Sequence, residues 1–296
     1  MKESVPADES RNGRGRDPVI DLNPQAAQMA DESMVRTLAA QAQAIWPQEA
    51  PLLLRYRLPQ EPAVLDAGCG TGEGASRLAE LFGSARVLGV DIIDAHLDVA
   101  RSRYARLAPR LSFSHQSLYA LDAADEAFDL VACRHVLHSI PHTDRVLAEL
   151  LRVTRRGGYV HIIAEDYGMI HFDEQSGVRD FWSVAPAAFG AATGTDLFVG
   201  RNIVPLLSQL DVDAITVDYA IVGTLRVAAR DIRRHAGGVA RRIRRSDRRA
   251  HAAVARSDGH RLRADDRNRA QSARLRGVDG ADRQRAKALT MWLAPT

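Results

Sequence analysis

Residues 64–72 form an apolar run that leads directly into three closely spaced glycines: Val64-Leu65-Asp66-Ala67-Gly68-Cys69-Gly70-Thr71-Gly72. The apolar run is typical of a buried strand, and a helical pattern begins just after the last glycine. Because glycine has no Cβ, the turn permits unusual backbone angles and lets a ligand lie against bare main chain. The stretch therefore predicts a strand, a ligand-binding turn and a helix.

Short apolar runs and amphipathic segments alternate on both sides of this turn. We expect strands at Ala63–Asp66, Arg86–Asp91, Leu111–His115, Phe128–Cys133, Gly158–Glu165 and Ala214–Val222. We expect helices at Ala26–Trp46 (one or two, ending before Pro47), Gly74–Leu81, Ala95–Ala105, Thr143–Val153, Arg179–Phe189 and Ile203–Leu210. This alternation predicts an α/β fold with a doubly wound, mostly parallel sheet and an N-terminal helical cap.

Composition divides the chain into a flexible tail (residues 1–24), the α/β domain (25–225) and an atypical Arg-rich tail (226–296). Up to residue 225 there are 20 basic and 30 acidic side chains, whereas the remainder has 20 basic and 7 acidic ones, none of them Glu. Apolar residues in this tail are too sparse to predict stable packing.

We hypothesise a reading-frame change between Leu225 and Asp231. A natural solvated tail and a nucleic-acid-binding arm are the alternatives, and the lack of interleaved aromatic residues disfavours the arm.

The glycine spacing distinguishes between two classes of nucleotide-binding turn. Dinucleotide-binding folds have G-x-G-x-x-G, whereas residues 66–72 read D-x-G-x-G-x-G. The latter resembles the first motif of the class I S-adenosylmethionine-dependent methyltransferases, and residues 63–167 resemble that family as a whole. The resemblance implies S-adenosylmethionine as cofactor, bound by Asp66, Gly68, Cys69, Gly70, Gly72, Asp91, Ile92, Ser117, Leu118 and Arg134.

Several of these positions have separate expected roles. Asp91 ends the second strand, where a carboxylate accepts hydrogen bonds from both ribose hydroxyls, and Ile92 would lie against the adenine ring. Ser117 stands where the family often has an acidic residue, so its hydrogen bond to the adenine amino group would be weaker, while the Leu118 N–H would meet the ring. Arg134 either meets the cofactor carboxylate or forms a surface ion pair.

Methyl transfer requires a general base only when the acceptor is a hydroxyl or a protonated amine. His135, His138 and Tyr167 are weak candidates for catalysis, and capping or packing roles compete with it. His161, on a buried strand, is expected to be a core residue. The family's Asn-Pro-Pro-Tyr signature is absent after the fourth strand, which disfavours nucleobase and glutamine amide acceptors.

We therefore expect a methyltransferase that acts on a small molecule. Its acceptor pocket would lie between helices at 26–46 and 179–210, with Phe181, Trp182 and Phe189 giving it aromatic walls. A catalytically impaired methyltransferase-fold binding protein is the alternative, and an NAD-dependent enzyme is a second one. The family usually closes its sheet with an antiparallel hairpin, whose last strand would fall inside the Arg-rich tail.

Apolar runs, the N-terminus and the cysteines bear on the location of the protein and on metal binding. No run of 18 apolar residues exists and the polar N-terminus lacks a signal sequence, so we expect a cytoplasmic protein without a membrane segment. The two cysteines have no metal-ligand spacing, which predicts reduced thiols and no bound metal. The sequence leaves the oligomeric state open.

Overall fold

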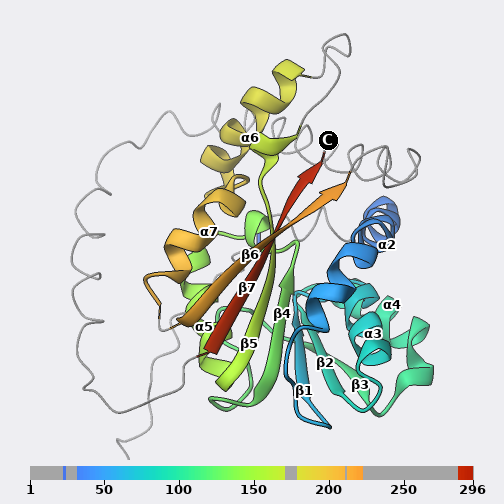
Figure 1. Ribbon diagram of the computed structural model, residues 1–296. Coiled ribbons are helices and arrows are strands. Elements are labelled where there is room, and N and C mark those ends of the chain that lie inside the picture. The colour runs from blue at the N-terminus through green and yellow to red at the C-terminus, as the bar shows by residue number, and fades with distance from the viewer. Residues whose placement is uncertain (1–22, 25–31, 171–178, 211, 223–285, 296) are drawn as a thin grey trace, which may run out of the picture.

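The computed structural model describes residues 23–24, 32–170, 179–210, 212–222 and 286–295 (Figure 1). Its strands are β1 (Ala63–Ala67), β2 (Arg86–Asp91), β3 (Leu111–His115), β4 (Phe128–Arg134), β5 (Thr154–Glu165), β6 (Val212–Val222) and β7 (Ala286–Pro295). The α-helices are α2 (Glu32–Leu53), α3 (Glu73–Leu81), α4 (Asp94–Arg103), α5 (Thr143–Val153), α6 (Arg179–Thr193) and α7 (Val199–Leu207), and short 3₁₀ turns are η1 (Ala105–Leu107), η2 (Leu137–Ser139) and η3 (Tyr167–Met169). No helix within these ranges combines the length and apolar character needed to cross a membrane.

The seven strands form one sheet in the order β3-β2-β1-β4-β5-β7-β6, and all neighbouring strands are parallel. The chain moves outward from β1 to β3 and then returns to place β4 on the other side of β1. The predicted doubly wound, mostly parallel sheet is therefore confirmed. In such sheets ligands bind beyond the carboxyl ends of the strands where the order reverses, which here is between β1 and β4.

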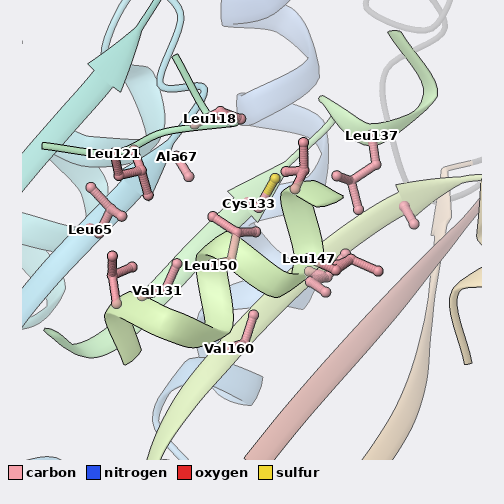
Figure 2. Packing of buried hydrophobic residues seen from close by; sticks show 14 of the residues in the cluster. Leu65, Ala67, Leu118, Leu121, Val131, Cys133, Leu137, Leu147, Leu150 and Val160 are labelled. Atoms are coloured by element: carbon pink, nitrogen blue, oxygen red, sulfur yellow. The ribbon is translucent and has the colours of Figure 1, made fainter. Parts of the chain in front are cut away.

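Helices cover both faces of the sheet (Figure 1). Successive residues of a strand point to opposite faces, so Leu65 and Val131 pack with α5 and α7 while Val64 and Leu130 pack with α3 and α4. Figure 2 shows the first of these two clusters, in which Leu150 of α5 lies among side chains of β1, β4 and β5. Burial on both faces explains why these strands are nearly continuous apolar runs.

The covering helix α2 was predicted to end before Pro47, and this prediction is wrong. It continues to Leu53, past two prolines. Ile45 and Leu52, on either side of Pro47, are buried in one cluster with Ile163 of β5. Tertiary packing on the sheet therefore outweighs the local cost of proline inside a helix.

The Arg-rich tail contributes the strand β7, so the expectation that its sparse apolar residues form no stable packing is wrong for Ala286–Pro295. Residues 226–285 of that tail lie outside the described residues, and the reading-frame hypothesis stays a prediction. The expected antiparallel closing strand is not what the structure has, because β7 runs parallel to both β5 and β6. A parallel neighbour needs a connection of a dozen or more residues, and the segment 223–285 exceeds that length.

Candidate functional site

A pocket lies at the carboxyl ends of β1, β2 and β4, at the point where the strand order reverses. Eight of the ten predicted cofactor residues line it: Gly68, Cys69, Gly70, Asp91, Ile92, Ser117, Leu118 and Arg134. α2 closes the pocket from above with Leu38, Gln41, Ala42 and Ile45. The structure therefore brings together residues from the turn after β1, the end of β2, the loop after β3 and β4, which the sequence motifs had marked separately.

The glycine turn offers bare main chain but few free donors. The N–H groups of Gly68 and Cys69 both donate to the carbonyl oxygen of Val90, at 2.8 and 2.9 Å. The N–H of Gly70 donates to Oδ2 of Asp91 at 2.8 Å. A pyrophosphate site needs unpaired N–H groups at such a turn, so the hydrogen bonding here disfavours a dinucleotide.

Asp91 is fixed at the end of β2 by the backbone on either side of the pocket. Its Oδ2 accepts from Gly70 and its Oδ1 accepts from the N–H of Ile93 at 3.0 Å. A carboxylate has about four lone-pair positions, and these two bonds use half of them. The side chain thus keeps acceptor capacity for a pair of neighbouring hydroxyls.

Two predicted cofactor residues lie outside the pocket lining. Asp66 is buried beneath the turn and accepts from the Arg134 guanidinium at 3.2 Å. Gly72 has a φ of 80°, and a Cβ there would lie 2.9 Å from atoms of Ala100 and Phe113. Gly72 is therefore needed for close packing of α3, α4 and β3, and Asp66 acts on the pocket only through Arg134.

Arg134 joins β4, β1 and α2 through a buried network that the sequence analysis missed in part. It pairs with Asp66 and, at 3.4 Å, with Glu49 of α2. Burial alone would raise the pKa of Glu49, but Arg134 and His161 together lower it to about 2. No local pattern marks Glu49 in the sequence, because its partners come from strands far along the chain.

His161 is the expected core histidine. It is fully buried, its Nδ1 is 2.8 Å from the Tyr56 hydroxyl, and its Nε2 is 3.3 Å from Glu49.

Three buried polar atoms of pocket-lining residues fit a bound cofactor. The Oγ1 of Thr71, the Nε of Arg134 and the Oγ of Ser139 have no hydrogen-bond partner among the described residues, and all three residues line the pocket. Buried polar groups are normally paired, so these atoms are suited to the polar amino-acid end of a ligand.

The charge of the wall favours a cation. Three carboxylates line it, from Glu49, Glu73 and Asp91. Glu49 pairs with Arg134 and Glu73 pairs with Arg103, which leaves the charge of Asp91 in excess. In a low-dielectric cleft such an excess of negative charge attracts a positive group. S-Adenosylmethionine carries a sulfonium ion, so the electrostatics of the pocket fit it.

The three candidate catalytic residues occupy different environments. His135 lines the pocket, whereas His138 is buried, pairs with Glu165 and does not reach the pocket lining. Tyr167 is also buried, and its ring stacks on Trp182 with centroids 5.8 Å apart. Of the three, only His135 is placed to meet a ligand in this pocket.

The described aromatic residues that were expected to line an acceptor pocket do not line the pocket at the glycine turn. Trp182 and Phe189 are buried with Tyr167 and Leu197 in a cluster of their own, and none of them lines the cofactor pocket. The side chain of Phe181 lies outside the described residues. Trp182 stacks on Tyr167 of η3. The residue pattern of α6 alone could not reveal this contact.

The doubly wound sheet, the glycine turn and the carboxylate of Asp91 meet at one pocket. Residues 64–158 match the family described as "Methyltransferase domain". This part of the chain is therefore similar to methyltransferase domains.

Curated relatives resemble a part of the chain. Phthiotriol/phenolphthiotriol dimycocerosates methyltransferase of Mycobacterium tuberculosis is 40% identical over 32% of this chain and 35% of its own length. Trans-aconitate 2-methyltransferase of Variovorax paradoxus is 31% identical over 39% of this chain and 43% of its own length. The structure of geranyl diphosphate C-methyltransferase from Streptomyces coelicolor aligns with a TM-score of 0.43 and 14% identity, covering 56% of this chain and 58% of that one. The chain thus spans less than half the length of the phthiotriol/phenolphthiotriol dimycocerosates methyltransferase and of the trans-aconitate 2-methyltransferase.

Proposed function

We propose that the chain transfers a methyl group from S-adenosylmethionine to a small-molecule acceptor. The observation that carries the proposal is the acidic pocket in which the glycine turn, Asp91 and Arg134 meet. When bound, the cofactor supplies a methyl group that its sulfonium has already activated. The chain's own contribution is then to position the two reactants and to exclude water.

We propose that different residues hold each part of the cofactor. Asp91 accepts from the ribose hydroxyls, while Ile92 and Leu118 hold the adenine ring. Arg134 and Thr71 face the amino-acid end, because their buried polar atoms have capacity left. Ser117 accepts a weaker hydrogen bond than a carboxylate would, which lowers the expected affinity.

A small acceptor is supported by the way α2 covers the pocket. Leu38, Ala42 and Ile45 form an apolar roof, and a roofed pocket is suited to a molecule that enters it rather than to a polymer. Trans-aconitate 2-methyltransferase, one of the relatives, is named for a small molecule. As part of the same proposal we assign the protein to the cytoplasm, since Cys69 and Cys133 are buried free thiols.

Transfer of labelled methyl groups tests this proposal. The protein would be incubated with S-adenosylmethionine carrying a tritiated methyl group and with a metabolite extract, and labelled products would be separated by size. Label in molecules below about 1 kDa is the expected result. Cofactor binding without any transfer would instead favour the catalytically impaired binding protein, and label in nucleic acid or protein would contradict a small acceptor.

A further inference from the structure

A buried carboxylate beside the pocket receives three side-chain partners. Oε1 of Glu165, at the end of β5, lies 2.8 Å from Nε2 of Gln41 and 2.8 Å from Nδ1 of His135. Its Oε2 pairs with Nδ1 of His138. The direct contacts leave no space for an ion between the groups, and no set of three metal-ligating side chains is found in the described part of the chain.

The charge on Glu165 fixes where the protons of these partners lie. Burial alone would raise the pKa of Glu165, but His138 and His135 hold it well below its ordinary value. An ionised carboxylate can only accept hydrogen bonds, so Nδ1 of His135 must carry a proton. A neutral His135 then has its lone pair on Nε2, which is the form that accepts a proton from a ligand.

The backbone of His135 is held in an unusual conformation. Its φ is 60°, which is uncommon for a residue other than glycine. The bond from its N–H to the carbonyl oxygen of Ile163, at 3.0 Å, holds it there. Such conformations persist where the surrounding structure over-determines them, often at functional sites.

The two histidines are not equivalent. His135 follows β4 directly and lines the pocket next to the glycine turn, where Val136 abuts Gly68. His138 is 3% exposed, and its ring lies 5.5 Å from that of Tyr167, away from the pocket lining. Glu165 therefore orients both rings, but only His135 can reach a reactant.

Resting on the proposed function, we propose that His135 is the general base of the transfer, that Glu165 positions it, and that the acceptor atom is a hydroxyl oxygen. In the reaction the acceptor oxygen bonds to the methyl carbon while the carbon–sulfur bond breaks and its electron pair stays on sulfur. Nε2 of His135 takes the hydroxyl proton, and Glu165 stabilises the resulting imidazolium. The products are a methyl ether and S-adenosylhomocysteine.

Charge favours a hydroxyl over the other acceptors. A carboxylate acceptor has no proton to lose, and the carboxylates of Glu49, Glu73 and Asp91 would repel it. The sulfonium already occupies the negative wall, so an ammonium acceptor would bring a second positive charge beside it, and it has no lone pair for the attack until it loses a proton. A neutral hydroxyl is repelled by neither the carboxylates nor the sulfonium, and it has a proton that the base can accept.

The first test is the position of the proton on His135, read by ¹⁵N NMR of the imidazole rings in the full chain without any ligand. In wild type the neutral imidazole of His135 is expected to carry its proton on Nδ1, which faces Glu165, and to leave Nε2 without one. In E165Q, the amide NH₂ can donate to Nδ1, so the population with a proton on Nε2 should rise. A proton on Nε2 of wild-type His135 would overturn the proposal.

The second test uses three flat probes, catechol, benzoate and benzylamine, with labelled S-adenosylmethionine. H135N is the variant, because Asn tolerates a positive φ, and H142N is its control, because His142 has a φ of 51° but is exposed. We expect methylation of catechol, a loss of at least about 100-fold in kcat in H135N, and wild-type behaviour in H142N. Cofactor binding by calorimetry should be unchanged in H142N and should change far less than kcat in H135N, because His135 lines the pocket.

The outcomes separate this inference from the proposed function. If wild type does not bind S-adenosylmethionine, the proposed function fails. If it binds the cofactor but methylates benzoate or benzylamine instead of catechol, or if H135N matches wild type, only the base and the hydroxyl acceptor are wrong. If no probe is methylated, the NMR result decides, with a proton on Nδ1 supporting the inference and one on Nε2 overturning it.

Discussion

Glu49 of α2 and Arg134 of β4 form an ion pair in which neither side chain is more than 10% exposed. The two residues are 85 positions apart. Since Arg134 also pairs with Asp66 of β1, one guanidinium connects the covering helix to the two central strands. The pocket therefore depends on a helix that precedes the family match at 64–158.

Substituting Glu49 should change how stability depends on pH. The folded-state pKa is about 2 and the ordinary value is 4.5, so the ionised group stabilises the fold above pH 4.5 and this contribution is lost as the pH falls toward 2. The full effect is roughly 3 kcal/mol, of which about 2 kcal/mol disappears between pH 6 and pH 3. E49Q should show a pH dependence that is smaller by this amount.

Urea unfolding at the two pH values measures that difference. E61Q is the matched control, because Glu61 is exposed and its substitution should leave the pH dependence as in wild type. Equal pH dependence in E49Q and wild type would mean that Glu49 is not held ionised by Arg134.

Gly74 should be needed for the position of Arg134. A Cβ at Gly74 would lie 0.9 Å from Nη2 of Arg134 and 2.0 Å from its Cζ. G74A therefore has to displace the guanidinium and leave buried carboxylates without their partner, at a cost of about 2 kcal/mol or more. G83A is the control, since nothing lies within 4 Å of a Cβ there. Equal free energies of unfolding for the two variants would refute the role of Gly74.

Gly68 combines two constraints that a double substitution can separate. Its φ is 76°, and a Cβ would lie 2.4 Å from Cγ2 of Val136. G68A should therefore weaken both stability and cofactor binding, and adding V136A should relieve the clash. The double variant should still be less stable than V136A by about 1 kcal/mol, because the backbone strain remains. Full recovery of stability in denaturant titrations would show that the positive φ is not required.

The central strands and the cofactor motifs were predictable because their signals are local. β2, β3 and α5 have the predicted bounds, and β1 and β4 each extend one residue further. Apolar runs identify strands that are buried on both faces, and the spacing of Gly68, Gly70 and Gly72 follows from the backbone angles of one turn. Asp91 was predictable for the same reason, since it ends a strand next to that turn.

The rest depends on contacts between distant segments. α2 passes Pro47 because the sheet packs against it, and β7 finds its place beside β5 only in the folded chain. The partners of Glu49 and Glu165 come from other elements, so their low pKa values have no signature in the sequence. The secondary-structure propensity and residue pattern of one segment cannot reveal any of these features.

Calorimetric titration of wild type and D91N with S-adenosylmethionine, S-adenosylhomocysteine and NAD⁺ tests the central claim most directly. Losing the carboxylate that accepts from the ribose should weaken binding of both sulfur nucleosides by roughly 10- to 100-fold. D98N, at an exposed position of α4, should bind like wild type, and NAD⁺ should give no heat. No binding of S-adenosylmethionine by folded wild type, or saturable binding of NAD⁺ in its place, would contradict the account.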